Sequence, residues 1–249
     1  MKQKKIILSG PYGGLNIGDD AIALVLIDEL QKLGYEIIIA CDNKIKAKVL
    51  FPNNKIIFRL HLRGMKLETI KYLKDVDGII IGGGEQFGEP RIPNPIWGHI
   101  ATNLQLLLLA KYYNIFYGTI AVGFDTNISK FSSYLIEYIL PYANFIGVRD
   151  DNSKKYLEDK INYKESSLGA DPAFLLDEKD KKRSRISLHE KYDIPNSSQI
   201  IAIIPSIDKF HSLGYINIIN NVVRNIANDG VYIVYAISDL QKGYDYDIF

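Results

Sequence analysis

The residues with the clearest chemical potential lie in three turns, each of which follows an apolar run. The first turn, at 10–20, has the sequence GPYGGLNIGDD; the second, at 82–86, is GGGEQ; and the third, at 148–153, is VRDDNS. Glycines permit positive φ and let a ligand approach backbone N–H groups closely. A guanidinium such as that of Arg149 suits a carboxylate or a phosphate. These turns therefore indicate binding of an anionic or hydroxyl-rich ligand.

Each turn also has a plainer interpretation, which the residues alone leave open. The first turn does not have the G-x-G-x-x-G spacing of dinucleotide sites, and no Lys-Ser or Lys-Thr follows as in a P-loop. It can be a tight turn with an aspartate cap, although Asn16 places a polar side chain inside it. The triple glycine can be a flexible strand end, and Asp150 or Asp151 with Ser153 can do no more than cap a helix.

The elements that would position these turns are short β-branched runs that alternate with helical patterns. We expect helices after a cap at Asp19 or Asp20, with Gly34 as the stop, and after a cap at Asp150 or Asp151. Further helices are expected at 97–113 and 134–140, and strands at 5–9, 36–40, 55–60, 78–81, 115–122 and 145–148. This alternation predicts an α/β fold with a Rossmann-like parallel sheet. The three turns would then meet at the carboxyl edge of that sheet, where ligands bind.

The second part of the chain is expected to be a smaller α/β unit. We predict a Rossmann-like N-terminal domain at 1–176, a charged linker and short helix at 177–198, and the start of a second Rossmann-like domain at 199–249. In that last segment, a strand, a helix near 212–228 and a second strand are expected. Two strands and one helix cannot cover both faces of a sheet. We therefore expect that this unit docks elsewhere or, as we favour, that the chain lacks its natural remainder.

Composition excludes several classes of protein. The formal net charge is +1, so no overall field would hold a nucleic acid or an anionic membrane. The longest strongly apolar stretch, 104–110, is far shorter than the roughly 20 residues of a membrane helix. The single cysteine, Cys41, fits a reducing compartment. None of the four scattered histidines has the spacing of a metal site, so no metal is expected.

Four segments taken together resemble the polysaccharide pyruvyl transferase family. They are NIGDDA at 16–21, the three glycines at 82–84, VRDDNS at 148–153 and DPAF at 171–174. In their order and spacing, they cover about residues 5–176. The resemblance implies a GT-B-like architecture with a cleft between two Rossmann-like halves. It also implies transfer of pyruvate from phosphoenolpyruvate onto two hydroxyls of a cell-surface glycan sugar as a cyclic ketal.

The same resemblance suggests partners and site residues. The acceptor would be a carbohydrate or lipid-linked glycan, and phosphoenolpyruvate would be the donor substrate, with no cofactor. A cytoplasmic location is expected, with peripheral membrane association and oligomeric state left open. Arg149 is the candidate for an anion contact, and Asp19 and Glu85 are the candidates for catalysis. The other candidate substrate-binding residues are Gly13, Gly14, Asn16, Gly18, Gly83, Gly84 and Gln86.

One departure from the family pattern affects the expected activity. Family members carry an Arg-x-His segment in the second half, and none occurs after residue 199 here. Arg59-Leu60-His61 has the right letters but lies on an expected strand of the first domain, so we interpret it as a coincidence. Two rival functions remain open: a GT-B glycosyltransferase that uses a nucleotide sugar, and a non-catalytic glycan-binding module.

Overall fold

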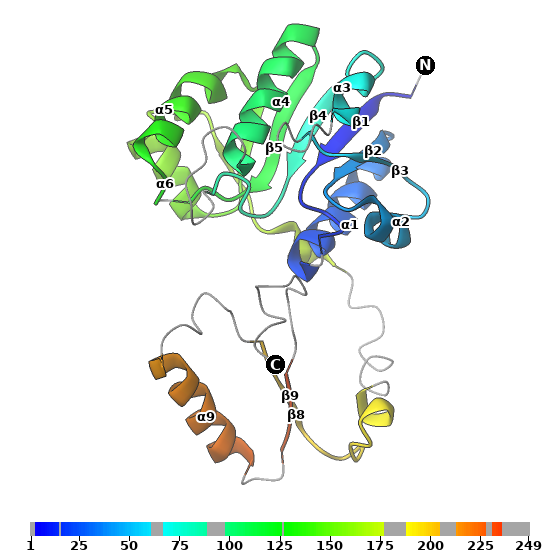
Figure 1. The fold of residues 1–249 in the computed structure, drawn as a ribbon, viewed down its shortest axis with the longest axis vertical. Helices are drawn as coiled ribbons and strands as arrows, with labels where there is room; N and C mark the ends of the chain where they lie inside the picture. The colour runs from blue at the N-terminus through cyan, green and yellow to red at the C-terminus, as the bar shows by residue number, and fades with distance from the viewer. Residues whose placement is uncertain are drawn as a thin grey trace. The chain divides into compact units, whose positions relative to one another are not determined.

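The computed structural model describes residues 3–14, 16–60, 67–88, 98–125, 127–176, 188–204, 213–227 and 231–235. The chain divides into two compact units (Figure 1). One comprises Met1–Gly14 and Gly18–Leu176, and the other comprises Leu15–Ile17 and Asp177–Phe249.

The first unit is built on a seven-stranded sheet with the order β3-β2-β1-β4-β5-β6-β7. Every neighbouring pair is parallel. The strands are β1 (Lys5–Ser9), β2 (Glu36–Cys41), β3 (Lys55–Phe58), β4 (Gly78–Gly82), β5 (Phe116–Val122), β6 (Phe145–Val148) and β7 (Ser167–Leu168). The predicted parallel α/β fold is therefore confirmed.

Helices cover both faces of this sheet. They are α1 (Ile17–Lys32), α2 (Lys44–Leu50), α3 (Glu68–Tyr72), α4 (His99–Tyr113), α5 (Lys130–Ile139) and α6 (Asp151–Asp159), with 3-10 turns η1 (Leu140–Tyr142) and η2 (Pro172–Leu175). Neighbouring residues of β1 serve different cores: Ile7 packs with α4, α5 and α6, whereas Leu8 packs with α1 and α2. A strand buried on both faces must be largely apolar, as β1 and β4 are.

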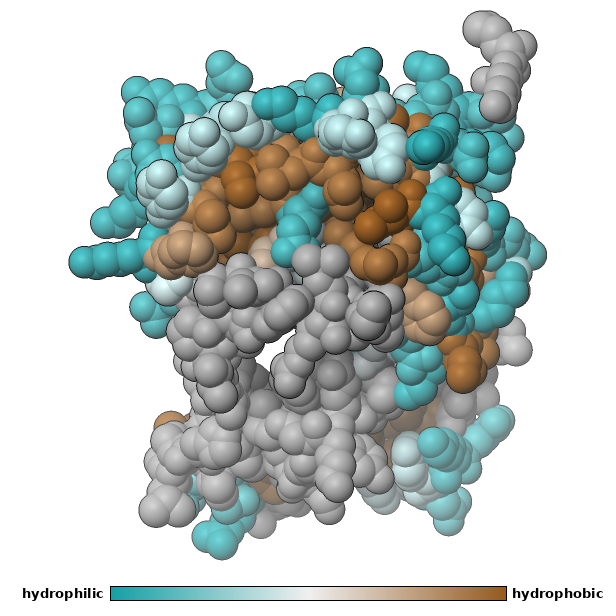
Figure 2. Space-filling view, turned by 45° about the horizontal axis from the view of Figure 1, so that its top comes forward, coloured by the Kyte–Doolittle hydropathy of each residue, from teal (hydrophilic) through white to brown (hydrophobic). Residues whose placement is uncertain are grey.

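The strand order sets the place of the site. From β1 the chain crosses by α1 to β2, and from β4 it crosses by α4 to β5 on the other side of the sheet (Figure 1). Because β1 and β4 are neighbours, the two crossovers diverge at the carboxyl ends of these strands, which is where open parallel sheets bind ligands. Apolar surface also remains exposed on the first unit, where Figure 2 shows a broad brown area bordered by hydrophilic residues.

Both ends of α1 and the start of α6 had been predicted from the sequence. Helix α1 begins at Ile17, so the predicted cap at Asp19 or Asp20 is wrong, and both carboxylates lie in the first helical turn. There they still face the positive end of the helix dipole. The predicted cap at the third turn is confirmed at Asp150, whose side chain accepts a hydrogen bond from the Ser153 N–H. Gly34, at φ +88°, follows the end of α1 as predicted.

The second unit contains a helical segment at 188–191, strand β8 (Ile200–Ile203), helix α9 (Leu213–Ala227) and strand β9 (Tyr232–Tyr235). The two strands pair in parallel, with α9 as their crossover. The predicted charged segment at 177–187 lies outside the described residues.

Candidate functional site

Tyr12 ties the turn after β1 to the end of β4. Its hydroxyl donates a 2.7 Å hydrogen bond to the Gly82 carbonyl, and its ring is buried. Burial raises the pKa of Tyr12, as does the charge of Asp19 to a smaller extent, whereas Arg59 acts in the opposite direction. Tyr12 is therefore a neutral donor, and its bond places the first glycine turn beside the second.

The first turn uses part of its backbone to hold its own shape. Gly13 has a φ of +69°, and a β-carbon there would lie 2.7 Å from the Asn43 carbonyl oxygen, so glycine is required. The Gly13 N–H donates to Asp20 Oδ1 at 2.7 Å. Burial raises the pKa of Asp20, and this hydrogen bond opposes the rise. The Gly13 amide is thus engaged by Asp20 and not presented to a ligand.

The remaining candidates of the first turn lie around the start of α1. Gly14 and Asn16 are half-buried, and Gly18 is exposed. Asp19 reaches across to the second turn, because a β-carbon on Gly84 would collide with the Asp19 carboxylate. Gly83 likewise lies against the Ile22 side chain. The glycines of the second turn therefore let α1 and its carboxylate approach the backbone of β4 directly.

The second turn is also bound to the end of β5. The Gly83 N–H donates to the Ile120 carbonyl at 2.8 Å, and the Gly123 N–H donates to the Gly84 carbonyl at 2.8 Å. The chain reaches this second bond through an irregularity in β5, where Ala121 has a φ of 53° and the register shifts. The Gly83 amide is therefore used inside the sheet rather than offered to a ligand.

Arg149 lies above the end of β5. A β-carbon on Gly123 would be 2.9 Å from the Arg149 Nε, so glycine leaves the space that the guanidinium occupies. The Arg149 Nε donates to Asp150 Oδ2 at 3.2 Å, and the arginine side chain is 30% exposed. Arg149 is consequently both accessible and partly neutralised by its neighbour.

Asp150 organises the third turn. Its Oδ1 accepts from the Ser153 N–H at 2.8 Å, and the Ser153 Oγ accepts from the Phe124 N–H at 2.9 Å. Burial raises the pKa of Asp150, but the hydrogen bonds from Ser153 and Arg149 outweigh it, so the pKa lies below its usual value. Asp150 is therefore a carboxylate at neutral pH, and it holds the turns after β5 and β6 together.

These contacts form a continuous path along one edge of the sheet, from Asp19 through Gly84 and Gly123 to Arg149. The structure thus brings together candidates from all three turns. Glu85 is exposed beside this path, and its carboxylate lies near Gly88.

Gln86 adjoins this path, because its Nε2 would lie 3.3 Å from a β-carbon on Gly84, and it extends into a polar cluster that sequence analysis missed. Its Oε1 accepts from Arg59 Nη2 at 3.0 Å, and Asn103 Oδ1 accepts from the same nitrogen at 2.8 Å. Arg59 Nη1 lies 3.1 Å from His99 Nδ1. Since arginine can only donate, this ring nitrogen accepts and His99 is in the neutral Nε2-protonated form. Gln86 is 1% exposed, so its amide holds Arg59 inside the molecule.

Arg59 was not singled out from the sequence, because the strand expected at 55–60 includes it. In the structure β3 ends at Phe58, so Arg59 directly follows its strand, as Arg149 follows β6. The third residue of the Arg59-Leu60-His61 segment, His61, lies outside the described residues.

The fourth segment of the resemblance, DPAF at 171–174, borders a separate cavity. Asp171 Oδ1 accepts from the Ala173 N–H at 2.9 Å, and Phe174 is exposed. Together with residues of α1, β5 and β6, this segment borders an apolar cavity of about 430 Å³. The cavity includes Ile120 and Gly147 in its lining, so it lies against β5 and β6 within the first unit.

The described residues contain no cluster of three histidine, cysteine, aspartate or glutamate side chains that could hold a metal ion. Within the same residues, no helix has the length and apolarity needed to cross a bilayer.

Three solved structures share this fold at low sequence identity. A glycosyltransferase from Rickettsia africae ESF-5 is 18% identical with a TM-score of 0.58, over 96% of this chain and 70% of that one. S. aureus MnaA, solved with UDP, is 14% identical with a TM-score of 0.51, over 95% and 63%. The UDP-GlcNAc 2-epimerase from Neisseria meningitidis bound to UDP-GlcNAc is 15% identical with a TM-score of 0.53, over 94% and 65%.

These likenesses establish the GT-B-like fold that was predicted. This chain spans between 63% and 70% of the length of those proteins. No curated protein matches this chain. The polysaccharide pyruvyl transferase family model matches residues 16–248, which extends beyond the four segments into the second unit. The chain belongs to the polysaccharide pyruvyl transferase family.

Proposed function

We propose that this protein is a glycan-modifying transferase that moves pyruvate from phosphoenolpyruvate onto a sugar as a ketal. The observation that carries the proposal is the family match over residues 16–248. The line of contacts from Asp19 to Arg149 supports it, because that line places a carboxylate and an accessible guanidinium on one edge of the sheet.

The reaction defines what the site must supply. A proton is added to the methylene carbon of phosphoenolpyruvate, and a sugar hydroxyl adds to the neighbouring carbon. The bond from that carbon to the phosphate oxygen breaks, and a second hydroxyl closes the ring. One hydroxyl proton balances the proton added to the methylene, and the other leaves on phosphate. The site thus needs an acid, a base and cationic groups for the donor.

The residues can be assigned on this basis. Arg149 would bind the donor carboxylate or phosphate, since a guanidinium fork matches both groups. Asp19 and Glu85 would transfer protons, and Asn16 and Gly18 would contact the acceptor near the start of α1. Gly83 and Gly84 would act by admitting Asp19 rather than by offering their own amides. Gln86 would act by holding Arg59 in place.

The proposed reaction also implies which molecules take part and where in the cell it occurs. The donor is the only small molecule required besides the glycan, so no cofactor takes part. A carbohydrate or a lipid-linked glycan is the acceptor, and the protein works in the cytoplasm, where donors for cell-surface glycans are made.

The test is phosphate release from phosphoenolpyruvate in the presence of galactose- or mannose-containing acceptors. We expect release that depends on the acceptor, and mass spectrometry should detect a product glycan that carries one pyruvate ketal. The matched control is Arg149→Ala, which should release little phosphate. Turnover of a nucleotide sugar without phosphate release from phosphoenolpyruvate would favour a glycosyltransferase instead. Acceptor binding with neither turnover would favour a glycan-binding module.

A further inference from the structure

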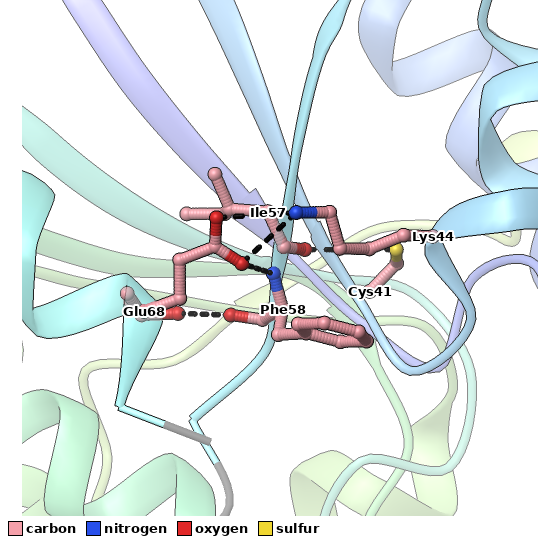
Figure 3. Close-up of polar contacts among 6 residues, drawn as sticks. Cys41, Lys44, Ile57, Phe58 and Glu68 are labelled. Carbon is pink, nitrogen blue, oxygen red and sulfur yellow. Dashed lines mark hydrogen bonds and ion pairs between the residues drawn. The ribbon is translucent and has the colours of Figure 1, made fainter.

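The end of β3 is held firmly in position (Figure 3). Glu68, at the start of α3, accepts from the Phe58 N–H at 2.8 Å, and Thr69 Oγ1 donates to the Phe58 carbonyl at 2.7 Å. The next N–H along the chain, that of Arg59, donates to the Cys41 carbonyl at 2.9 Å. Arg59 therefore leaves β3 from a fixed backbone.

The nearby carboxylate of Glu68 is engaged with another cation. Both of its oxygens bind Lys44 Nζ, at 3.1 Å each. Figure 3 shows these contacts as dashed lines. Burial raises the pKa of Glu68, but the hydrogen bonds from Phe58 and Lys44 outweigh it and leave the pKa below its usual value. Glu68 is thus ionised, and its charge is balanced by Lys44.

Among the described residues, no carboxylate balances the charge of Arg59 in this way. It is 3% exposed, and its partners are the amides of Gln86 and Asn103 and the neutral ring of His99. Within the described part of the chain, no carboxylate forms an ion pair with it. A buried charge without a counter-ion is costly, and buried charges in proteins are normally paired.

One donor of Arg59 is also unsatisfied. Among the described residues, nothing accepts a hydrogen bond from its buried Nε. Buried donors are almost always paired, so this N–H is suited to an acceptor atom that a ligand brings. Both the missing counter-charge and the missing acceptor would be supplied by one anionic oxygen.

The start of α4 adds to the positive potential at this place. His99, the first residue of α4, contacts Arg59, and the N-cap Gly98 offers no side-chain cap. The first turn of α4 also contains no acidic residue. The dipole of this 15-residue helix therefore reinforces the charge of Arg59.

We propose that Arg59, together with Gln86, Asn103 and the first turn of α4, forms a second anion subsite, which takes a carboxylate or phosphate oxygen of a ligand. This subsite differs from the anion contact at Arg149, which lies against the turns after β5 and β6. It follows from the charge and hydrogen bonds of Arg59 and does not depend on the proposed pyruvyl transfer, so its test requires no turnover.

The test compares thermal unfolding of the full chain with added inorganic phosphate or pyruvate, at an ionic strength held constant with sodium chloride. All variants carry Arg149→Ala, so that the other guanidinium cannot respond. We expect the melting temperature of this background to rise with anion concentration and Arg59→Met to abolish the rise. Arg224→Gln, which changes an exposed arginine of α9, should retain it. A response to phosphate alone would identify a phosphoryl ligand, and a response to pyruvate alone a carboxylate ligand.

A second variant keeps the test decisive if Arg59→Met does not fold. Asn103→Asp places a carboxylate oxygen at the position that lies 2.8 Å from Arg59 Nη2, and so supplies an internal counter-ion. We expect this variant to lose the response to added anion, because the charge is already neutralised. The proposal is overturned if neither anion raises the melting temperature of the background, or if the rise persists in Arg59→Met or Asn103→Asp.

Discussion

The ends of β3 and β6 each present an arginine, and the two arginines are held in opposite ways. Arg149 has its own carboxylate partner, Asp150, and is 30% exposed. Arg59 is 3% exposed and is surrounded by neutral acceptors. A guanidinium with a built-in carboxylate can exchange that partner for a ligand at low cost. A guanidinium without one depends on its neighbours for solvation, so those neighbours should matter far more to stability.

The ends of β3 and β6 should differ most in how much folding stability is lost when a side chain that supports the arginine is removed. Asn103 accepts from Arg59 and donates to the Gln86 carbonyl at 2.8 Å. Asn103→Ala should lower the free energy of unfolding by about 3 kcal/mol, because a buried charged donor and a buried carbonyl lose partners. Urea denaturation followed by circular dichroism measures this loss.

The matched change at the end of β6 is Ser153→Ala. It leaves the Phe124 N–H without its acceptor, and one neutral hydrogen bond contributes about 1 kcal/mol. Equal losses for Asn103→Ala and Ser153→Ala would show that Arg59 is no more dependent on its surroundings than Arg149.

The next prediction concerns ligand binding at Arg149. Arg149→Ala should weaken phosphoenolpyruvate binding by roughly 10- to 100-fold, since a hydrogen bond to a charged group contributes about 1.5–3 kcal/mol. The free energy of unfolding should change by less than about 1 kcal/mol, because exposed ion pairs contribute little. Calorimetric titration measures the affinity, and Arg149→Lys should be intermediate because it keeps the charge but loses the fork. An unchanged affinity in Arg149→Ala would remove this residue from the donor site.

The smallest expected effect is a pH dependence at the end of β6, where Asp150 is the partner of Arg149. Because the pKa of Asp150 is lowered in the folded protein, its ionised form adds stability above the unfolded pKa of about 3.9. That contribution is lost as the pH falls through the lower folded pKa. Asp150→Asn should therefore be less stable than wild type at pH 7 by under about 1 kcal/mol, since asparagine still caps the helix.

The difference between the Asp150→Asn variant and the wild type should shrink below about pH 4, where the aspartate of the unfolded chain takes up a proton before that of the folded protein does. Denaturation curves at pH 7 and pH 3 test this. The direct partners of Arg59 include no carboxylate, so at the end of β3 a pH dependence of this kind is expected from Glu68, whose pKa is also lowered, and not from Arg59.

Much of the fold could be predicted because the strong signals are local. Continuous apolar runs marked β1 to β6, but not the two-residue β7, and Asp150 marked the start of α6. Helices α2 and α3 were not predicted, because they have only seven and five residues. Such short helices depend on contacts made after folding, such as the ion pair of Lys44 with Glu68, which are 24 residues apart.

Only those parts of the candidate site that lie within a single turn could be predicted from the sequence. Three glycine or charged turns at one edge follow from the parallel direction of the strands, which the alternation of strands and helices predicts. The cap assigned to Asp19 or Asp20 was wrong, since α1 starts earlier and Asp20 binds the Gly13 amide. The surroundings of Arg59 could not be predicted, because its partners lie 27, 40 and 44 residues away.

The interior position of β1 in the sheet has a consequence for synthesis. Strand β1 precedes both of its partners in the sequence, and it pairs with β2 on one side and with β4 on the other. A nascent chain that has not yet exposed Gly82 therefore carries a strand with an open hydrogen-bonding edge, which other chains can pair with. The sheet is complete only when Leu168 has emerged, so the first unit must be protected through most of its own translation.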